Sequence, residues 1–183
     1  MKKSLVMASL VAASTSMMAM DLQYFLGAGV ERGDLEMKIS NAAGRNESYD
    51  DYATDLKLKA GIILDKTHRI SLSHVNYGIE DGGDFRIILG NYDYLIPINE
   101  EFRFLAGVHL GNANFKLDNA DFKISGLAYG AQVGAIYDIT NNVEFELGLG
   151  YTKYNVDREE DANYDRVELE NSTSMSAGIN YKF

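Results

Sequence analysis

The sequence predicts an all-β fold, an eight-stranded antiparallel up-and-down transmembrane β-barrel that follows a cleavable signal peptide. Three observations predict it. Apolar and polar residues alternate with a period of two in eight segments, as side chains do on the two faces of a β-strand. Short and long polar connections alternate between these segments. The N-terminus has the composition of a secretory signal.

The signal peptide is predicted at residues 1–20, which leaves 21–183 for the barrel. Lys2 and Lys3 form a charged start, an apolar stretch runs from Leu5 to Ala13, and small residues follow. We place cleavage after Ala19 or Met20. The chain has no cysteine, which excludes both a lipoprotein anchor and a disulfide framework.

Average composition does not distinguish a membrane barrel from a soluble protein. The chain is 46% hydrophobic with a mean hydropathy of −0.20. After the signal, no apolar run approaches the roughly 20 residues that a helical span needs. A barrel gives only a weak hydropathy signal, because every second residue of a strand faces the lumen and can be polar. A soluble periplasmic β-sandwich is the alternative fold.

The eight alternating segments are the predicted strands. The third segment changes phase near Ser73 or His74, which we interpret as a β-bulge, and the start of the fourth is ambiguous. The last segment alternates up to Phe183. The segments are 21–31, 55–64, 69–79, 84–96, 101–111, 125–138, 143–154 and 172–183.

The connections differ in length between the two ends of the predicted barrel. Short turns are expected at 65–68, 97–100 and 139–142, and the other connections at 32–52, 80–83, 112–121 and 155–171, three of them long and polar. Long loops are extracellular in outer-membrane barrels. Many of their residues are acidic: Asp34, Glu36, Glu47, Asp50, Asp51, Asp157, Glu159, Glu160, Asp161, Asp165, Glu168 and Glu170.

The acidic connections have two interpretations. They bind basic partner surfaces or divalent cations, or they form a solvated, repulsive surface. No spacing matches a calcium-binding loop, so we predict no metal site, and we expect no cofactor.

The inward face of the strands is predicted to be small and charged. Ten glycines fall on it: Gly27, Gly29, Gly61, Gly107, Gly111, Gly130, Gly134, Gly148, Gly150 and Gly178. An eight-stranded interior is only wide enough to be filled by side chains, so charges there must pair. The predicted lumen charge network is Glu31, Asp55, Lys57, Lys59, Asp93, Arg103, Asp138, Glu144, Glu146 and Lys182.

Aromatic residues gather near the strand ends, as in the two interfacial girdles of membrane barrels. The girdle at the short-turn end is predicted from Tyr24, Tyr94, Phe102, Tyr137, Phe145, Tyr181 and Phe183. The opposite girdle is predicted from Tyr52, Tyr77, Tyr151 and Tyr154.

With its terminal alternation of Ile179, Tyr181 and Phe183, the chain resembles the small outer-membrane barrels: OmpX, OmpW, the opacity proteins and the transmembrane domain of OmpA. The resemblance implies the outer membrane of a Gram-negative bacterium and a monomer in contact with outer-membrane lipid and lipopolysaccharide. It also implies that these three residues are an assembly signal read by the barrel-assembly machinery. Unlike OmpA, no peptidoglycan-binding domain is expected after the barrel, and no nucleic acid partner is expected.

For function, we predict a non-enzymatic barrel with a structural or surface-interaction role, in which the acidic loops contact an extracellular protein partner and charged side chains plug the lumen. A narrow channel for small solutes or ions is the alternative. A lipid A-modifying enzyme is a third reading, because the segment SHVNYG resembles part of the lipid A deacylase motif. In that segment Asn76 stands where the nucleophilic serine would be, and Ser73 would face away from His74. No catalytic residue is therefore predicted.

Overall fold

The computed structural model describes the backbone of residues 21–40, 46–79, 83–117, 122–155 and 166–183. Side chains are described for residues 21–34, 53–78, 85–114, 125–155 and 171–183. The predicted signal peptide lies outside these ranges, so it stays a prediction.

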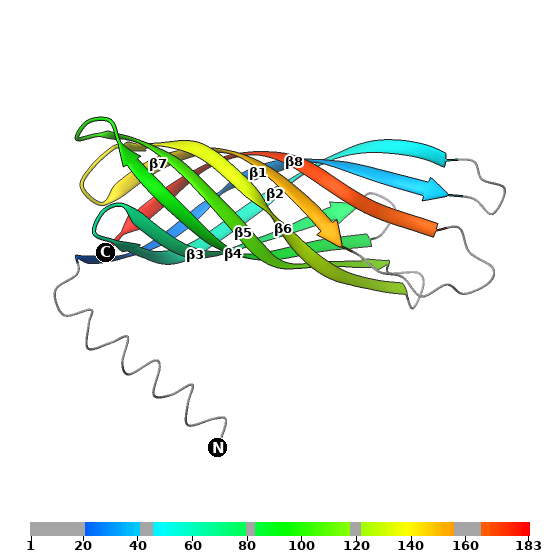
Figure 1. Ribbon diagram of the computed structural model, residues 1–183. Coiled ribbons are helices and arrows are strands. Elements are labelled where there is room, and N and C mark those ends of the chain that lie inside the picture. Colours follow the sequence, from blue (N-terminus) through cyan, green and yellow to red (C-terminus); the bar gives the residue numbers. More distant parts are fainter. Residues whose placement is uncertain (1–20, 41–45, 80–82, 118–121, 156–165) are drawn as a thin grey trace, which may run out of the picture.

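Eight antiparallel strands form a closed barrel, which confirms the predicted fold class (Figure 1). Each strand pairs with its neighbours in the chain, and β1 closes the barrel against β8. The strands are β1 (Leu22–Ser40), β2 (Asn46–Leu64), β3 (His68–Ile79), β4 (Gly83–Pro97), β5 (Phe102–Leu117), β6 (Phe122–Asp138), β7 (Val143–Asn155) and β8 (Arg166–Lys182).

Three tight turns join the strands at one end, as the sequence predicts. Between β2 and β3, Asp65 and Lys66 both have positive φ and Thr67 N donates to Leu64 O at 3.1 Å, the geometry of a type I′ hairpin. Between β4 and β5, Asn99 Oδ1 accepts from the backbone N–H groups of Glu101 and Phe102. Between β6 and β7, Thr140 Oγ1 likewise accepts from the backbone two and three residues further on. Side-chain oxygens thus replace the missing backbone acceptors in these two turns.

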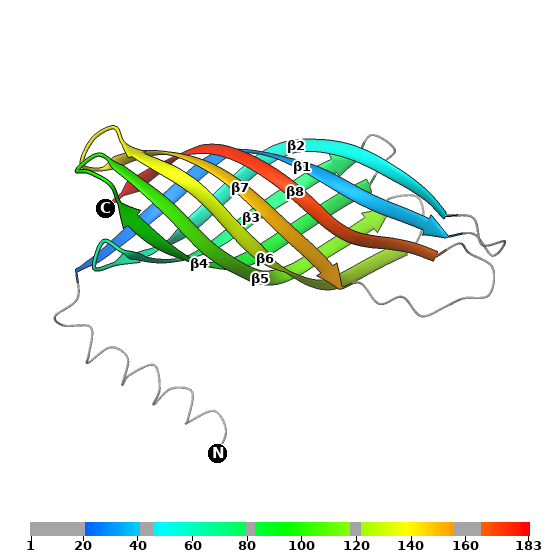
Figure 2. The same ribbon diagram turned by 45° about the horizontal axis from the view of Figure 1, so that its top comes forward.

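At the opposite end the strands continue further than predicted. The polar stretch 32–52 was expected to be a loop, but β1 runs to Ser40 and β2 begins at Asn46. β5 and β8 also extend into predicted loops, to Leu117 and from Arg166. In Figure 2, β1, β2 and β8 project beyond the other strands. Polar side chains do not prevent backbone pairing in water, which is why polarity alone overestimated these loops.

The predicted bulge in β3 is wrong. Its register with β4 is continuous from His68 to Ile79, and Ser71, Ser73, Val75 and Tyr77 all face the lumen. The polarity of the two faces changes along the strand, while the backbone stays regular. The register shift recorded in the barrel lies elsewhere, between Glu36 and Met37 of β1 against β8.

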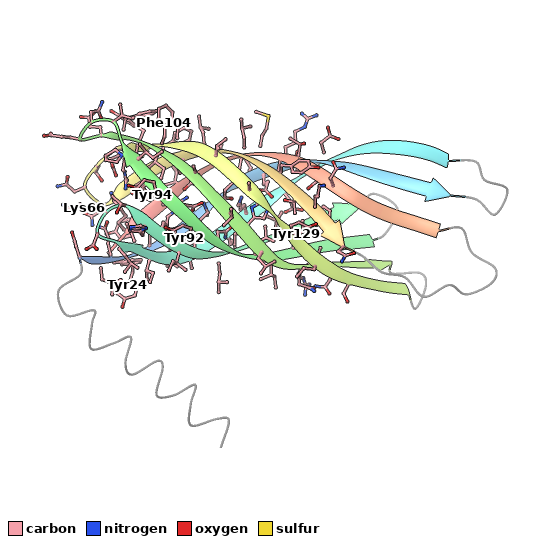
Figure 3. The ribbon with its side chains drawn as sticks, viewed as in Figure 1. Tyr24, Lys66, Tyr92, Tyr94, Phe104 and Tyr129 are labelled. Atoms are coloured by element: carbon pink, nitrogen blue, oxygen red, sulfur yellow. The ribbon has the colours of Figure 1, made fainter. Side chains whose placement is uncertain are left out.

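Among the described side chains, the outer wall carries the predicted girdle aromatics, with two exceptions. Tyr24 and Tyr94 lie exposed on this wall in Figure 3, and so do Tyr92, Phe104 and Tyr129, which were not among the predicted girdle residues. Tyr77 and Tyr154, which were predicted for the far girdle, are instead buried inside the barrel. Tyr151 does face outward, and the side chain of Tyr52 lies outside the described residues.

Candidate functional site

The centre of the lumen is occupied by an ion-pair cluster around Arg69. Its guanidinium is fully buried and pairs with Asp93 on the adjacent strand β4 at 2.8 Å. It also reaches Glu146 on β7 at 2.7 Å, and Lys59 on β2 binds the same carboxylate at 2.5 Å. Two cations and two carboxylates therefore meet on the barrel axis. We name these four residues, Lys59, Arg69, Asp93 and Glu146, the central layer.

Side-chain amides complete the central layer. Gln132 on β6 donates to Asp93, and Asn180 on β8 donates to Glu146 at 2.9 Å. The charges are thus held from strands on every side of the lumen, and their remaining oxygen lone pairs are used. A buried ion pair is stable only when its hydrogen bonds are satisfied in this way.

Inward-facing glycines provide the room that these side chains occupy. A Cβ atom at Gly107 would lie 2.1 Å from the carboxylate of Asp93, and one at Gly27 would lie 2.1 Å from the amide of Asn180. Neither side chain could keep its position beside even an alanine. The glycines of the polar face are therefore part of the charge network.

A second ion-pair cluster lies toward the short turns. Arg103 on β5 binds Asp138 at 2.9 Å and also binds Glu144. Lys182 on β8 binds the same two carboxylates, at 2.5 and 3.0 Å. We name this set the short-turn layer: Arg103, Asp138, Glu144 and Lys182. An apolar cluster lies in the same half of the lumen and consists of Phe25, Ile63, Leu95, Leu105 and Ile136.

The extended-strand half of the lumen begins with a third pair. Lys57 binds Glu31, and Tyr77 donates to the other oxygen of Glu31 at 2.8 Å. Beyond it the interior is apolar and aromatic. The Phe85 ring stacks on Tyr77 and meets Tyr154 edge-on, with ring centroids 6.2 and 5.8 Å apart. We name this set the outer plug: Val75, Tyr77, Phe85, Ile87, Ala113, Ala128 and Tyr154.

A cavity of about 30 Å³ lies between the central layer and the outer plug. Serine and threonine side chains on β3, β7 and β8 line it, together with His109, whose Nε2 lies 3.0 Å from Thr152 Oγ1. A polar space of this size holds about one or two water molecules. A second cavity, of about 20 Å³, lies beside Lys59, Glu146 and Asn180. The described interior is therefore filled except for small polar spaces.

The outer wall is apolar from the level of the central layer to the short turns. Among the side chains that the structure describes, 27 large apolar ones are exposed; Leu72, Val108 and Met175 are examples, and Leu72 is 65% exposed. A protein in water would not expose such a continuous belt, whereas a closed barrel in lipid requires it. No helix long and apolar enough to cross a membrane occurs among the described residues.

Solved structures with this fold include outer-membrane proteins. The Neisserial surface protein A, NspA, aligns over 87% of this chain and 97% of its own with a TM-score of 0.64 and 18% identity. OprG from Pseudomonas aeruginosa aligns over 88% and 95% with a TM-score of 0.59 and 17% identity. OprH from P. aeruginosa aligns over 86% and 99% with a TM-score of 0.58 and 23% identity.

The chain is a small eight-stranded β-barrel of the bacterial outer-membrane type. This conclusion rests on the shared fold together with the apolar outer wall. No family model and no curated protein matches the sequence.

The structure places the predicted lumen residues in specific partnerships. Two of the pairs cross the lumen: Lys59–Glu146 and Arg69–Glu146 join β2 and β3 to β7. Asp55 does not pair with Lys57 or Lys59. It accepts from the backbone of Leu56 and Gly78 instead.

Arg69 is the central residue that sequence reasoning missed. It begins the third alternating segment, where the apolar residues Ile70 and Leu72 follow with a period of two. If Ile70 and Leu72 face outward, the same alternation places Arg69 in the lumen. The signal was therefore present, but Arg69 was left out of the predicted lumen charge network.

The remaining predicted residues lie at two other places. Ile179, Tyr181 and Phe183 face outward on β8 and just after it, with the rings of Tyr181 and Phe183 in edge contact at 5.1 Å. Ser73 faces the lumen, where it accepts from Asn91 at 3.1 Å, while His74 and Asn76 belong to the outer face of β3. No group of three potential metal ligands occurs among the described residues.

Proposed function

We propose that the protein is a non-enzymatic outer-membrane barrel with a closed lumen, which holds extended strands and acidic connections at the cell surface for contact with partners. The observation that carries this proposal is the double closure of the interior. Ions entering from the short-turn end meet two layers of paired charges, and ions entering from the other end meet the outer plug.

The two closures oppose ions by different physical means. In the charged layers, each cation has at least one carboxylate partner within 3.0 Å, so that a passing ion must displace a satisfied pair. In the outer plug, packed apolar side chains give an ion no replacement for its water shell. Their combination favours a structural scaffold over a conducting pore.

Acidic residues concentrate where the barrel meets the exterior in the proposed orientation. β1 and β2 continue beyond the apolar belt through sequence that includes Glu36, Glu47, Asp50 and Asp51. The predicted loop residues Asp157, Glu159, Glu160, Asp161 and Asp165 fall in 156–165, outside the described residues. This negative charge supports the binding of partners that are basic, or of partners that a cation bridges to the surface.

The non-enzymatic part of the proposal is supported by the geometry around the deacylase-like segment. Ser73 and His74 lie on opposite faces of a regular strand, one inside the barrel and one outside. A serine nucleophile needs its histidine within hydrogen-bond reach on the same side.

Conductance of the purified barrel in a planar lipid bilayer tests the proposal against the channel alternative. A closed lumen predicts no steady ionic current above that of the bare bilayer. Large, steady current from the wild-type protein would instead establish the narrow channel. A porin inserted under the same conditions shows that insertion events are detectable.

The surface role needs a separate measurement on cells. We expect cells that display the protein to bind polylysine-coated beads, and a Glu159→Gln/Glu160→Gln/Asp161→Asn variant to bind fewer. The matched control is Glu100→Gln/Glu101→Gln, which neutralises exposed carboxylates in the turn between β4 and β5. Equal binding by both variants would contradict a role for the outer acidic segment.

A further inference from the structure

Three residues in the lumen, Lys59, Glu146 and Asn180, bring an amine and an amide together on one carboxylate. Nζ of Lys59 donates to Oε1 of Glu146 at 2.5 Å, and Nδ2 of Asn180 donates to Oε2 at 2.9 Å. The two nitrogen atoms are thus held by the two oxygens of a single group that can accept and return protons. This arrangement can support a reaction as well as an ion pair.

The backbone register places Lys59 and Asn180 on the two sides of one glycine. Lys59 on β2 is opposite Gly27 on β1, and Asn180 on β8 is opposite the same glycine. Twice the strand spacing, roughly 9–10 Å, separates the two backbones, and the long stem of lysine can cover most of it. A Cβ atom at Gly27 would lie 2.1 Å from Oδ1 of Asn180. The amide therefore extends over Gly27, toward the strand that carries Lys59.

The site is buried and has a small space beside it. Asn180 is 3% exposed, and the side chain of Lys59 is 9% exposed. The cavity of about 20 Å³ is lined by Gly27, Lys59, Glu146 and Asn180, and it fits about one water-sized molecule. Ammonia has that size. Burial also limits the access of water, which would compete with an amine for the amide carbon.

Lys182 lies near the same amide but is less well placed. It binds Glu144 at 3.0 Å, and Nδ2 of Asn180 lies 3.4 Å from that carboxylate. The corresponding distances at Glu146 are 2.5 Å from Lys59 and 2.9 Å from Asn180. The shorter contacts select Lys59 as the amine.

Arg69 holds the carboxylate of Glu146 in place between the amine and the amide. Its Nη1 donates to Oε2 at 2.7 Å and its Nη2 to Oε1 at 3.3 Å. A guanidinium keeps its proton in proteins, whereas the ammonium group of lysine can lose one. Only an unprotonated amine attacks a carbonyl carbon. Of the two cations on Glu146, Lys59 is therefore the one that can react.

We propose that Lys59 and Asn180 form an isopeptide bond in the folded barrel, with Glu146 as the acid and base. Oε1 of Glu146 takes a proton from Nζ of Lys59, and the free amine attacks Cγ of Asn180. A second proton passes from Nζ to Nδ2 through the carboxyl group. The Cγ–Nδ2 bond then breaks, ammonia leaves, and Nζ and Cγ stay joined as a secondary amide.

The reaction keeps the charges of the central layer balanced. The Nζ–Cγ bond replaces the Cγ–Nδ2 bond, and no group is oxidised or reduced. Because Glu146 retains the proton that Lys59 lost, one positive and one negative charge disappear together, while Arg69 stays paired with Asp93.

The new bond would join β2 to β8 across β1, at the seam where the barrel closes. A cross-link between distant parts of a chain stabilises mainly by restricting the unfolded state. The reaction occurs once in each chain. It depends neither on a closed lumen nor on the orientation of the barrel, so its failure would leave the proposed function unchanged.

Intact-mass spectrometry of the full barrel, refolded in lipid vesicles and then denatured, tests the inference. We expect a mass lower by one ammonia than that of the unfolded chain. After protease digestion, a peptide that contains Lys59 should be joined to one that contains Asn180. The same chain kept in urea should retain its full mass, because the three side chains meet only in the folded barrel.

Variants assign the role of each residue. Lys59→Arg keeps the positive charge but has no amine, and Asn180→Ala has no amide, so both should retain the full mass. Glu146→Gln should form the bond roughly a hundredfold more slowly, the usual contribution of a general acid or base. Lys59→Arg preserves the charge of the central layer and therefore tests the bond even if Glu146→Gln does not fold.

Lys57→Arg is the matched control. Lys57 is also a lumen lysine bound to a carboxylate, but the other oxygen of that carboxylate, on Glu31, accepts from the hydroxyl of Tyr77 and not from an amide. This variant should lose ammonia at the wild-type rate. Folding of every variant is checked by the mobility of the unboiled protein in a gel.

Full mass in the refolded wild-type barrel would overturn the inference. A loss of ammonia that persists in Lys59→Arg would place the reaction elsewhere in the chain, and a peptide that joins Lys182 to Asn180 would contradict the choice of amine. Formation of the bond in Glu146→Gln at the wild-type rate would remove the acid and base role of this carboxylate.

Discussion

Arg69 on β3 and Glu146 on β7 meet across the lumen, with Nη1 of the guanidinium 2.7 Å from Oε2 of the carboxylate. The two strands share no backbone pairing, so that this contact exists only because the barrel is closed. Glu146 also binds Lys59 and Asn180. One carboxylate therefore joins β2, β3, β7 and β8 at the level of the central layer.

Glu146→Gln should destabilise the barrel by roughly 3–5 kcal/mol, because it removes the shared partner of two buried cations. The free energy of unfolding is measured by urea titration in lipid vesicles, followed by tyrosine fluorescence, since the chain contains no tryptophan.

The control for this substitution is Glu101→Gln, which changes an exposed carboxylate in a turn, 3.3 Å from Tyr137 Oη. Its unfolding free energy should stay within about 0.5 kcal/mol of wild type. If the two variants unfold alike, the central layer does not stabilise the barrel.

Alternation in the sequence was sufficient to predict the strands, their order and which face of most of them meets lipid. The inward positions of Lys57, Lys59 and Glu146 follow from the same period of two. The partners of these residues cannot be derived in the same way. Strand tilt and stagger decide which residues of opposite strands lie at the same height once the barrel is closed, and pairs across the lumen depend on this. Sequence spacing within one strand contains no such information.

The predicted bulge in β3 failed for a different reason. Near the short turns the outer face is apolar and the lumen is polar, but Val75 and Tyr77 are buried inside while His74 and Asn76 belong to the outer face. The outer wall becomes polar where the lipid belt ends, and the lumen there is filled by the outer plug. The polarity of the two faces is therefore exchanged along a regular strand. If every apolar residue is assigned to the lipid-facing side, this exchange is mistaken for a change of phase in the alternation.

Gly130→Ala tests whether an inward glycine is required by its neighbours. A Cβ atom there would lie 1.9 Å from the carbonyl oxygen of Tyr151 and 2.6 Å from Nε2 of His109. We expect a loss of about 1–3 kcal/mol in unfolding free energy, the usual cost of overpacking. At Gly90, on the outer wall, the nearest atom would be 3.5 Å away. Gly90→Ala should therefore be near neutral, and equal losses at both positions would argue against a packed lumen.

Because the lumen is closed at two levels, we expect that removing the side chains that close one level will not make the barrel conduct ions. Arg103→Ala disrupts the short-turn layer and should lower stability, yet the outer plug should keep bilayer conductance low. Tyr77→Ala/Phe85→Ala should likewise conduct poorly while the charged layers stay paired. Conductance should rise only when the substitutions are combined.

A large current in Arg103→Ala alone would show that the outer plug does not close the lumen. An unchanged current in the combined variant would show that neither set of side chains limits ion flow. Each variant is first refolded and checked in an unboiled gel, so that conductance is compared only between folded barrels.

The orientation of the barrel can be tested by labelling single cysteines, because the native chain has none. Asp161→Cys, in a predicted extracellular loop, should react with a membrane-impermeant maleimide on intact cells. Asn141→Cys, in the exposed turn between β6 and β7, should react only after the outer membrane is permeabilised. The reverse pattern would invert the topology.

Phe183→Ala separates the folding of the terminal strand from its proposed role as an assembly signal. Phe183 N donates to Tyr24 O at 2.9 Å, a bond that Phe183→Ala keeps, whereas the edge contact of its ring with Tyr181 is lost. The variant should therefore refold in vesicles with less than about 1 kcal/mol of destabilisation, since the lost ring contact is exposed. In cells, the folded, heat-modifiable band in the outer membrane should nevertheless decrease.

Phe104→Ala is the control, because Phe104 is also an outward aromatic near the short turns, in edge contact with Phe102. If both variants reach the outer membrane at wild-type levels, the terminal ring is not needed for assembly. If both decrease equally, the loss reflects the aromatic girdle and not a signal at the terminal strand.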